Sequence, residues 1–257
     1  MTTPLVETFS QFGSRFYRGV DGLEDAIGVT SVLKNLDKEF LGYARAKLSG
    51  EYAWKHMPSL LPLYAEGEEQ AFVDVVKGAA TRKWNVARDL GTAVHNIFER
   101  LLLGEKIGSV HPEHKGFREQ AEKFVKEFDV EAIHVEKTCW NTRLNYAGTA
   151  DLFAKVAGET IVLDLKTGAS GIFPETALQL AAYANAEFLL EPDGTRLELP
   201  QLEGAAALSL RPDTFSVIPC RIDEEVFNVF EHLVGVSKWQ RGLSRSVLGP
   251  PVQAPNK

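Results

Sequence analysis

The chain has 257 residues, of which 44% are hydrophobic and 25% charged, a composition typical of a globular protein with a sizeable core. Its 35 acidic and 28 basic residues give a formal net charge of −7. This charge argues against a uniformly basic surface that binds nucleic acid, although a local basic patch is compatible with it. At roughly 150 residues per domain, this length favours a single domain with added segments over two independent domains.

Membrane insertion and secretion are not expected from the hydropathy of the chain. No apolar run approaches the ~18 residues that a membrane-spanning helix needs, and residues 1–20 contain no apolar core of a secretory signal. Cys139 and Cys220 are the only cysteines, too few for a disulfide framework, a four-thiolate zinc site or an iron–sulfur cluster held by this chain alone. We therefore expect a protein of the cytoplasm.

The first ninety residues are expected to be mainly helical. A helix is predicted over residues 31–48, with Thr30 or Ser31 as its cap, because apolar side chains there fall near helical spacing. These apolar side chains are Val32, Leu33, Leu36, Phe40 and Tyr43.

A second helical region is predicted from about residue 68 to residue 103. Pro58 and Pro62 are expected to break the chain between it and the first helix. We expect a bend near Gly78 or Gly91, because glycine inside a helix costs about 1 kcal/mol relative to alanine.

The middle of the chain changes to strand-forming residues. Runs rich in β-branched and aromatic residues predict strands over 132–141, 145–156 and 160–166, followed by a helix over 174–190 that opens with Pro174. Two more strands are predicted at 205–210 and 215–220, with a turn between them, and a last helix from about Asp223 to Gly242. This order predicts an α/β or α+β protein, a sheet with helices packed on it.

The end of the chain is basic and rich in proline. The stretch from Gly249 onward, GPPVQAPNK, predicts a disordered tail. No acidic residue follows Glu231, whereas four basic residues do: Lys238, Arg241, Arg245 and Lys257. We interpret this region as a solvated helix and tail, and a DNA contact is the alternative.

The hairpin formed by the second and third predicted strands brings two aspartates together. A turn centred on Ala157 and Gly158 places Asp151 opposite Asp164, with Gly148 permitting close backbone approach before the pair. A four-residue loop keeps this register, whereas a three- or five-residue loop shifts it by one. Opposed residues have Cβ atoms roughly 4.5–5.5 Å apart, and like charges at that separation destabilise a sheet. A sequence selected for stability alone would rarely contain this pair.

A bound cation would remove the repulsion between the two aspartates. Paired carboxylates on a rigid sheet form part of an oxygen cage for Mg²⁺ or Mn²⁺. Strand alternation places Lys166 on the face of Asp164 and turns Leu163 and Leu165 into the core, where the Leu165 backbone carbonyl remains available to the metal. The alternative interpretation is a surface hairpin with an Asp–Lys ion pair.

Three more polar residues lie on helices next to this hairpin. Gln179 and Tyr183 are four residues apart and share one face of an otherwise apolar helix. His95 lies on a helix that precedes the sheet, and a neutral imidazole suits Mn²⁺ better than Mg²⁺. A tyrosine packed with a satisfied hydroxyl and a structural histidine are the alternative interpretations.

Four short motifs follow one another in the chain: G-T-A-V-H at 91–95, G-T-A-D at 148–151, D-L-K-T-G at 164–168 and Q-L-A-A-Y at 179–183. Together they resemble the motif series of the PD-(D/E)XK nuclease superfamily, specifically its RecB-like branch. That branch includes the nuclease domains of bacterial recombination helicases, the CRISPR-adaptation nucleases and many phage exonucleases. The stretch from Val29 to Leu41 is similar to a helical segment of the phage members, so the resemblance covers roughly residues 29–221.

The resemblance implies a fold and a domain organisation. It implies a restriction-endonuclease-like αβββαβ core with a mixed central sheet, a helical N-terminal extension and a C-terminal helix. On this basis residues 1–242 form a single nuclease domain. Its parts are a mainly helical portion at 1–83, the core at 84–221 and the last helix at 222–242, followed by a flexible tail at 243–257.

The resemblance also implies a function: a metal-dependent phosphodiesterase that acts on DNA, as an exonuclease in phage or bacterial recombination or repair. It implies that the metal is bound by His95, Asp151, Asp164 and the Leu165 carbonyl. It implies a catalytic role for Asp151, Asp164 and Lys166, and substrate binding by Gln179 and Tyr183. Glu136 is an accessory candidate for a second metal and Glu99 a weaker one.

The chain departs from the family pattern in one respect. CRISPR-adaptation nucleases of this branch usually hold an iron–sulfur cluster with four cysteines, whereas Cys139 and Cys220 lie in predicted strands where an apolar role is expected, so no cluster is expected. No helicase motif or P-loop is present, which implies a stand-alone nuclease. A sequence- or structure-specific endonuclease and a non-catalytic DNA-binding protein are the alternatives. Binding to a recombination or single-strand-annealing protein and assembly into a homo-oligomer are further possibilities that the sequence leaves open.

Overall fold

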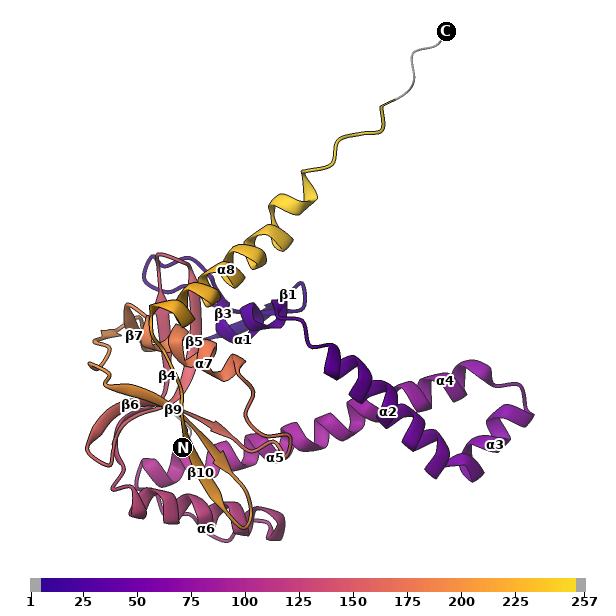
Figure 1. The fold of residues 1–257 in the computed structure, drawn as a ribbon, viewed down its shortest axis with the longest axis horizontal. Helices are drawn as coiled ribbons and strands as arrows, with labels where there is room; N and C mark the ends of the chain where they lie inside the picture. Colours follow the sequence, from indigo (N-terminus) through magenta and orange to yellow (C-terminus); the bar gives the residue numbers. More distant parts are fainter. Residues whose placement is uncertain (1–5, 253–257) are drawn as a thin grey trace. The chain divides into compact units, whose positions relative to one another are not determined.

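The computed structural model describes residues 6–252, which fall into two compact units (Figure 1). The larger unit contains the described residues up to Leu36 and those from His95 onward, and the smaller unit spans Asp37–Val94. Helix α5 (Ala79–Leu102) contributes residues to both. Within the described range, no helix is long and apolar enough to cross a membrane.

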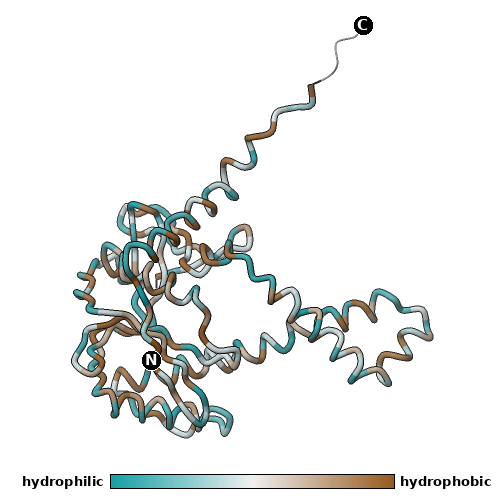
Figure 2. Tube along the Cα trace, viewed as in Figure 1, coloured by the Kyte–Doolittle hydropathy of each residue, from teal (hydrophilic) through white to brown (hydrophobic). Residues whose placement is uncertain are grey.

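The smaller unit consists of helices. They are α2 (Glu39–Lys55), α3 (Met57–Ala65), α4 (Glu69–Lys77) and the first part of α5. Hydrophobic and hydrophilic residues alternate along α2–α4 (Figure 2). Cation–π contacts join these helices, since the guanidinium of Arg45 lies 5.2 Å from the ring centre of Trp84 and that of Arg82 lies 4.9 Å from the ring centre of Tyr52.

Of the helix breaks predicted at glycine and proline residues in this unit, only some are present. The predicted bend at Gly78 is confirmed, because α4 ends at Lys77 with Gly78 as its C-cap, while α5 runs through Gly91 without interruption. Helix α2 ends just before Pro58, which occupies the first turn of α3. A break at Pro62 is wrong, since Pro62 lies inside α3.

The described part of the first ninety residues is mainly helical, as predicted, except for residues 8–28, where the prediction is wrong. Strands β1 (Thr8–Gln11), β2 (Ser14–Tyr17) and β3 (Ala26–Gly28) lie there. The first two form an antiparallel hairpin, and β3 pairs with β2 and, in parallel, with a strand far along the chain, where Ile27 lies opposite Tyr146. These strands are short, so their stability depends on partners that local sequence does not specify.

The predicted helix over 31–48 is also wrong as a single element. The chain forms α1 (Val29–Val32), capped by Gly28 rather than by Thr30 or Ser31, and then the 3₁₀ turn η1 (Leu33–Asn35). Leu36 is extended, with ψ of 130°, and α2 begins only at Glu39.

Ten strands of the described chain form one mixed sheet, as predicted. The five predicted strands are confirmed as β4 (Glu131–Asn141), β5 (Tyr146–Val156), β6 (Glu159–Lys166), β9 (Gly204–Leu210) and β10 (Phe215–Pro219). Antiparallel pairing joins β4 to β5, β5 to β6 and β9 to β10, whereas β6 pairs with β9 in parallel.

The helix predicted over 174–190 is too long. Helix α7 (Glu175–Ala184) ends before Asn185, and β7 (Phe188–Leu190) pairs with β4, so sheet pairing overrides the helical propensity of this stretch. Strand β8 (Arg196–Leu197) extends this edge. Helix α6 (Pro112–Glu127) was not predicted.

The last helix is confirmed as α8 (Glu224–Arg241), and Asp223 caps it by accepting a hydrogen bond from Val226 N at 3.2 Å. A 3₁₀ turn, η2 (Leu243–Arg245), follows it inside the predicted flexible tail. Residues 253–257 of that tail lie outside the described residues.

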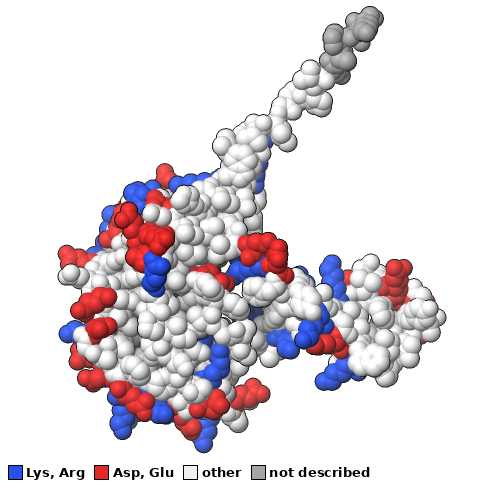
Figure 3. All heavy atoms as spheres, in the orientation of Figure 1, with Lys and Arg blue, Asp and Glu red and all other residues white. Residues whose placement is uncertain are grey.

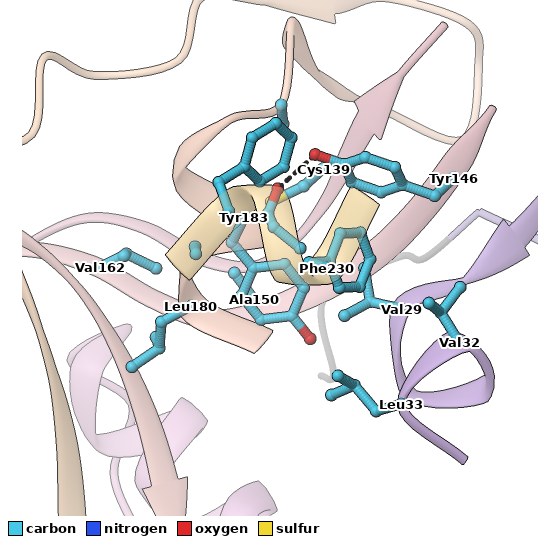
Figure 4. Close-up of a cluster of buried hydrophobic side chains, with 14 of the residues drawn as sticks. Val29, Val32, Leu33, Cys139, Tyr146, Ala150, Val162, Leu180, Tyr183 and Phe230 are labelled. Carbon is cyan, nitrogen blue, oxygen red and sulfur yellow. Dashed lines mark hydrogen bonds between the residues drawn. The ribbon is translucent and has the colours of Figure 1, made fainter. Parts of the chain in front are cut away.

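The main core of the larger unit lies between the sheet and helices α1, α7 and α8 (Figure 4). Tyr146 is fully buried there, packs edge-on against Phe230 with ring centres 5.0 Å apart and donates a hydrogen bond to Ala182 O at 2.8 Å. Cys139 belongs to this cluster and Cys220 packs against it, consistent with the apolar role expected for both.

Gly148 sets how closely α7 and α1 approach strand β5. A Cβ atom at this position would lie 2.7 Å from Tyr183 Cε1 and 2.9 Å from Val29 Cγ2, closer than van der Waals contact. Only glycine fits here without moving a helix.

Candidate metal centre

The hairpin of β5 and β6 has the predicted register. Ala157 and Gly158 have φ of 51° and 91°, the left-handed values of a two-residue type I′ turn. The ladder runs from the pair Val156–Glu159 to the pair Leu152–Leu163. Asp151 and Asp164 are the next residues on the two strands, so the register confirms that they stand opposite each other at the end of the ladder.

Asp151 connects β5 to two other elements. Its Oδ2 accepts a hydrogen bond of 2.6 Å from Leu165 N on β6, and its Oδ1 lies 3.5 Å from His95 Nδ1 on α5. Burial raises the pKa of Asp151, but His95, the Leu165 amide and Lys166 outweigh it and hold the pKa below its ordinary value. Leu165 thus contacts Asp151 through its amide, and the predicted metal contact of its carbonyl stays a prediction.

Glu136 brings a further carboxylate to Asp151 from strand β4. The pairs Val135–Leu152 and Lys137–Ala150 flank it, so Glu136 faces Asp151 across the strands. Its φ is 50°, a left-handed value that is unusual for a side chain other than glycine and that concentrates at functional sites. One ligand atom each of His95, Glu136 and Asp151 lies within 4.8 Å of the other two, which is close enough for a single metal ion.

Asp164 belongs to a hydrogen-bonded group beside these three residues. Its side chain is only 4% exposed, and its Oδ2 lies 2.7 Å from Lys166 Nζ. Gln179 Nε2 donates to Asp164 Oδ1 at 2.7 Å and to Tyr183 Oη at 3.0 Å, while Lys166 Nζ donates to Gln179 Oε1 at 3.2 Å. Gln179 and Tyr183, predicted to share one helix face, thus both belong to the hydrogen-bonded group around the Asp–Lys pair, and their implied substrate binding stays a prediction.

The charge balance of the cluster is unfavourable without a cation. Burial, followed by the Asp151 charge, raises the pKa of Glu136 to about 8. Burial and Asp151 also raise the pKa of Asp164 to about 6, against the opposing effect of Lys166. Burial lowers the pKa of His95, but Asp151 and Glu136 outweigh it and raise the pKa to about 9. All three groups thus bind a proton more tightly than they would in water, as expected where carboxylates crowd together.

A divalent cation fits this donor set. Imidazole and carboxylate ligands suit Mn²⁺, and the carboxylates alone suit Mg²⁺. Asp164 Oδ2 is buried and lies 2.7 Å from the Lys166 ammonium group. A carboxylate oxygen has two lone pairs, so this ion pair leaves one acceptor position for a further partner.

The structure therefore brings together most of the residues singled out from the sequence, including the accessory candidate Glu136. His95, Asp151, Asp164, Lys166, Gln179 and Tyr183 lie in one group of contacts, and Glu136 joins them at ligand distance. Glu99 is buried, and its charge contributes to the raised pKa of Glu136, but it is not one of the three grouped ligands. The signal for Glu136 in the sequence is its position on the strand next to Asp151, which becomes specific only once the β4–β5 register is known.

Comparison with known proteins does not assign a family or a function to the chain. No protein-family model matches the chain, and no curated protein matches it.

Proposed function

We propose that this protein is a metal-dependent nuclease that hydrolyses phosphodiester bonds in DNA, as an exonuclease. The single observation that carries the proposal is the meeting of Asp151, Asp164 and Lys166 at the end of one hairpin, beside His95 and Glu136. The elements α5, β4, β5, β6, α7 and β9 follow the order of the αβββαβ core that the four sequence motifs imply, with α6 inserted after α5 and with β7 and β8 inserted after α7. We further propose that this part of the larger unit is a RecB-like PD-(D/E)XK core.

The ligands of the metal would be His95, Glu136 and Asp151, with Asp164 Oδ2 adjoining them. Bound there, Mn²⁺ or Mg²⁺ would lower the pKa of a coordinated water and polarise the scissile phosphoryl group. Hydrolysis forms one phosphorus–oxygen bond from water and breaks the bond to the leaving sugar oxygen, which takes up a proton.

Lys166 supplies positive charge to this reaction. Its ammonium group is held by Asp164 and Gln179, and 32% of its side chain stays exposed and can face a substrate. In this position Lys166 would donate a hydrogen bond to a phosphoryl oxygen as negative charge develops there. Gln179 fixes the direction of this ammonium group, and Tyr183 holds Gln179.

DNA binding through a uniformly basic surface is not part of the proposal. Acidic and basic side chains are interspersed over the face of the molecule shown in Figure 3, in line with the net charge of −7. Cations at the carboxylate cluster offset local negative charge, so the formal net charge understates the attraction of the site for a phosphate.

The test is cleavage of end-labelled linear DNA and of covalently closed circular DNA during titration with MgCl₂ and MnCl₂. We expect metal-dependent shortening of the linear substrate and an intact circle. Cleavage of the circle would favour the endonuclease alternative. DNA binding without cleavage in any divalent ion would falsify the nuclease proposal and favour a non-catalytic DNA-binding protein.

Matched variants assign the activity to the site. Asp164→Asn is expected to abolish cleavage, whereas Asp213→Asn, in the exposed turn between β9 and β10, is expected to cleave like the wild type. Equal activity of both variants would contradict the site assignment.

A further inference from the structure

A polar, partly open cavity of about 370 Å³ lies in the larger unit, away from the metal centre. It is lined by the turn between β1 and β2, by helix α1 with η1, and by the end of α8 with η2. Its polar lining consists mainly of Ser14, Ser31, Lys34, Asn35, Arg241 and Arg245. Pockets for small ligands begin at about 300 Å³, so this one has room for a small charged ligand.

The charge of this cavity is entirely positive. Lys34, Arg241 and Arg245 line it, no carboxylate does, and none of the three cations forms an ion pair with a residue that the structure describes. The chain has no acidic residue after Glu231, so its C-terminal part brings no compensating charge. Three unpaired cations around one cavity, in a protein of net charge −7, favour an anion.

Arg241 is held in place at the base of the cavity. It donates to Ser237 O at 2.8 Å and to Ser14 Oγ at 2.5 Å. Its Nε is buried and has no hydrogen-bond partner among the described residues. Stabilisation of the C-terminal end of α8 explains the first contact. It does not explain the unpaired Nε, or why Arg245, four residues further on, and Lys34, from a distant part of the chain, line the same cavity.

The remaining groups keep donors for a ligand. Lys34 Nζ donates to Gly13 O at 3.0 Å, which leaves two of its three protons. The guanidinium of Arg245 lies 4.6 Å from the ring centre of Phe12, a side chain that is 66% exposed.

Two serine hydroxyls complete the donor set. Ser14 Oγ accepts from Arg241, and Ser31 Oγ accepts from Arg15 N at 2.8 Å. Each hydroxyl therefore retains its own hydrogen to donate.

We propose that this cavity binds a phosphate monoester. Such a group carries a charge of about −1.5 to −2 and three strong acceptor oxygens, which matches three cations and two hydroxyl donors. A carboxylate offers one charge and two oxygens and would leave donors unsatisfied. Phe12 adds an exposed aromatic ring on which a base can stack, so the ligand class is a phosphorylated nucleotide, either free or at a DNA end. This inference does not depend on nuclease activity.

The experiment is isothermal titration of the full chain in EDTA, so that neither metal nor cleavage contributes. The four ligands are inorganic phosphate, deoxyadenosine monophosphate and one oligonucleotide carrying a 5′-phosphate or a 5′-hydroxyl. We expect phosphate-dependent binding. A preference for the phosphorylated over the hydroxyl oligonucleotide would identify a DNA end as the source, whereas binding of the two small ligands alone would identify free phosphate compounds.

Matched variants locate the binding. Lys34 and Arg245 are exposed, so Lys34→Gln and Arg245→Gln are expected to fold, and each should weaken phosphate binding about tenfold, the loss of one charge-assisted contact. Lys115→Gln, an exposed change on α6, should leave the affinity unchanged. Circular dichroism and Tm confirm that each variant is folded. Absence of phosphate-dependent binding in every arm, or an equal loss in the Lys115→Gln control, would overturn the proposal while leaving the nuclease proposal untouched.

Discussion

Glu136 lies opposite Asp151 in the β4–β5 ladder, and both residues place an oxygen within 4.8 Å of a His95 nitrogen. Opposed like charges destabilise a sheet, and the raised pKa of Glu136, about 8, is the electrostatic result of that proximity and of burial. A proton or a divalent cation would relieve this repulsion, so metal binding by this pair can be tested directly.

The first prediction concerns the contribution of Glu136 to metal binding. Replacing Glu136 by Gln removes one charged ligand and should weaken Mn²⁺ binding by at least about tenfold, measured by isothermal titration. Glu131→Gln, at an exposed position on the same strand, should leave the affinity unchanged. Unaltered Mn²⁺ affinity in the Glu136 variant would remove it from the ligand set.

The second prediction separates catalysis from metal binding at Lys166. Lys166→Ala should lower the cleavage rate on the order of 100-fold or more, the usual effect of removing a group that stabilises transition-state charge. The variant should still bind Mn²⁺, because Lys166 is not one of the three grouped ligands. Lys155→Ala, on the exposed part of β5, serves as the control and should cleave normally. Unchanged single-turnover cleavage in Lys166→Ala would exclude the assigned role.

The third prediction tests whether Tyr183 acts through Gln179. Tyr183→Phe removes the acceptor of the Gln179 amide, at a cost of about 1 kcal/mol in the free energy of unfolding, and should lower cleavage because Lys166 loses its fixed direction. Tyr146→Phe removes a buried hydrogen bond to Ala182 O and should cost similar stability without affecting cleavage. The free energy of unfolding in denaturant and the cleavage rate are measured for both variants. Equal losses of activity in Tyr183→Phe and Tyr146→Phe would indicate that Tyr183 acts through packing alone.

The fourth prediction is a pH dependence of the metal-free protein. The pKa of Glu136 rises from 4.5 to about 8 on folding and that of His95 from 6.5 to about 9, so the folded state holds more protons than the unfolded state between these values. The free energy of unfolding should therefore fall as pH rises from about 5 to 9, by roughly 1.4 kcal/mol per pH unit for each extra proton held.

Two comparisons check this origin of the pH dependence. Glu136→Gln should flatten the decline of Tm with pH, because it removes one of the groups whose pKa rises on folding. Mn²⁺ should raise Tm more at pH 8 than at pH 6, because a metal competes with protons for the same ligands. A metal-free Tm that is constant over this range would contradict the proton balance described for the cluster.

The parts of the fold that depend on local sequence could be predicted. The Ala157–Gly158 turn and its β-rich flanks fix the register that brings Asp151 and Asp164 together, because a two-residue turn leaves no freedom in pairing. The spacing of Gln179 and Tyr183 likewise fixes their shared helix face.

The parts that depend on distant partners could not be predicted. Strand β3 is only three residues long and forms because it lies beside β5. The stretch at 188–190 continues a helical pattern and becomes a strand because β4 provides an edge. Glu136 is an accessory candidate from the sequence, but its left-handed backbone and its proximity to His95 depend on the folded strand pair and have no local sequence signal.

Gly148 carries a consequence for how loss-of-function variants of this protein are interpreted. A methyl group there would collide with Tyr183 and Val29 and displace helix α7 from the sheet, together with the amide that orients the lysine. An alanine at this position would keep every acidic group and the histidine intact and still be inactive. A mutational screen scored on activity alone would therefore rank this glycine among the reactive residues, although its contribution is the space it leaves empty.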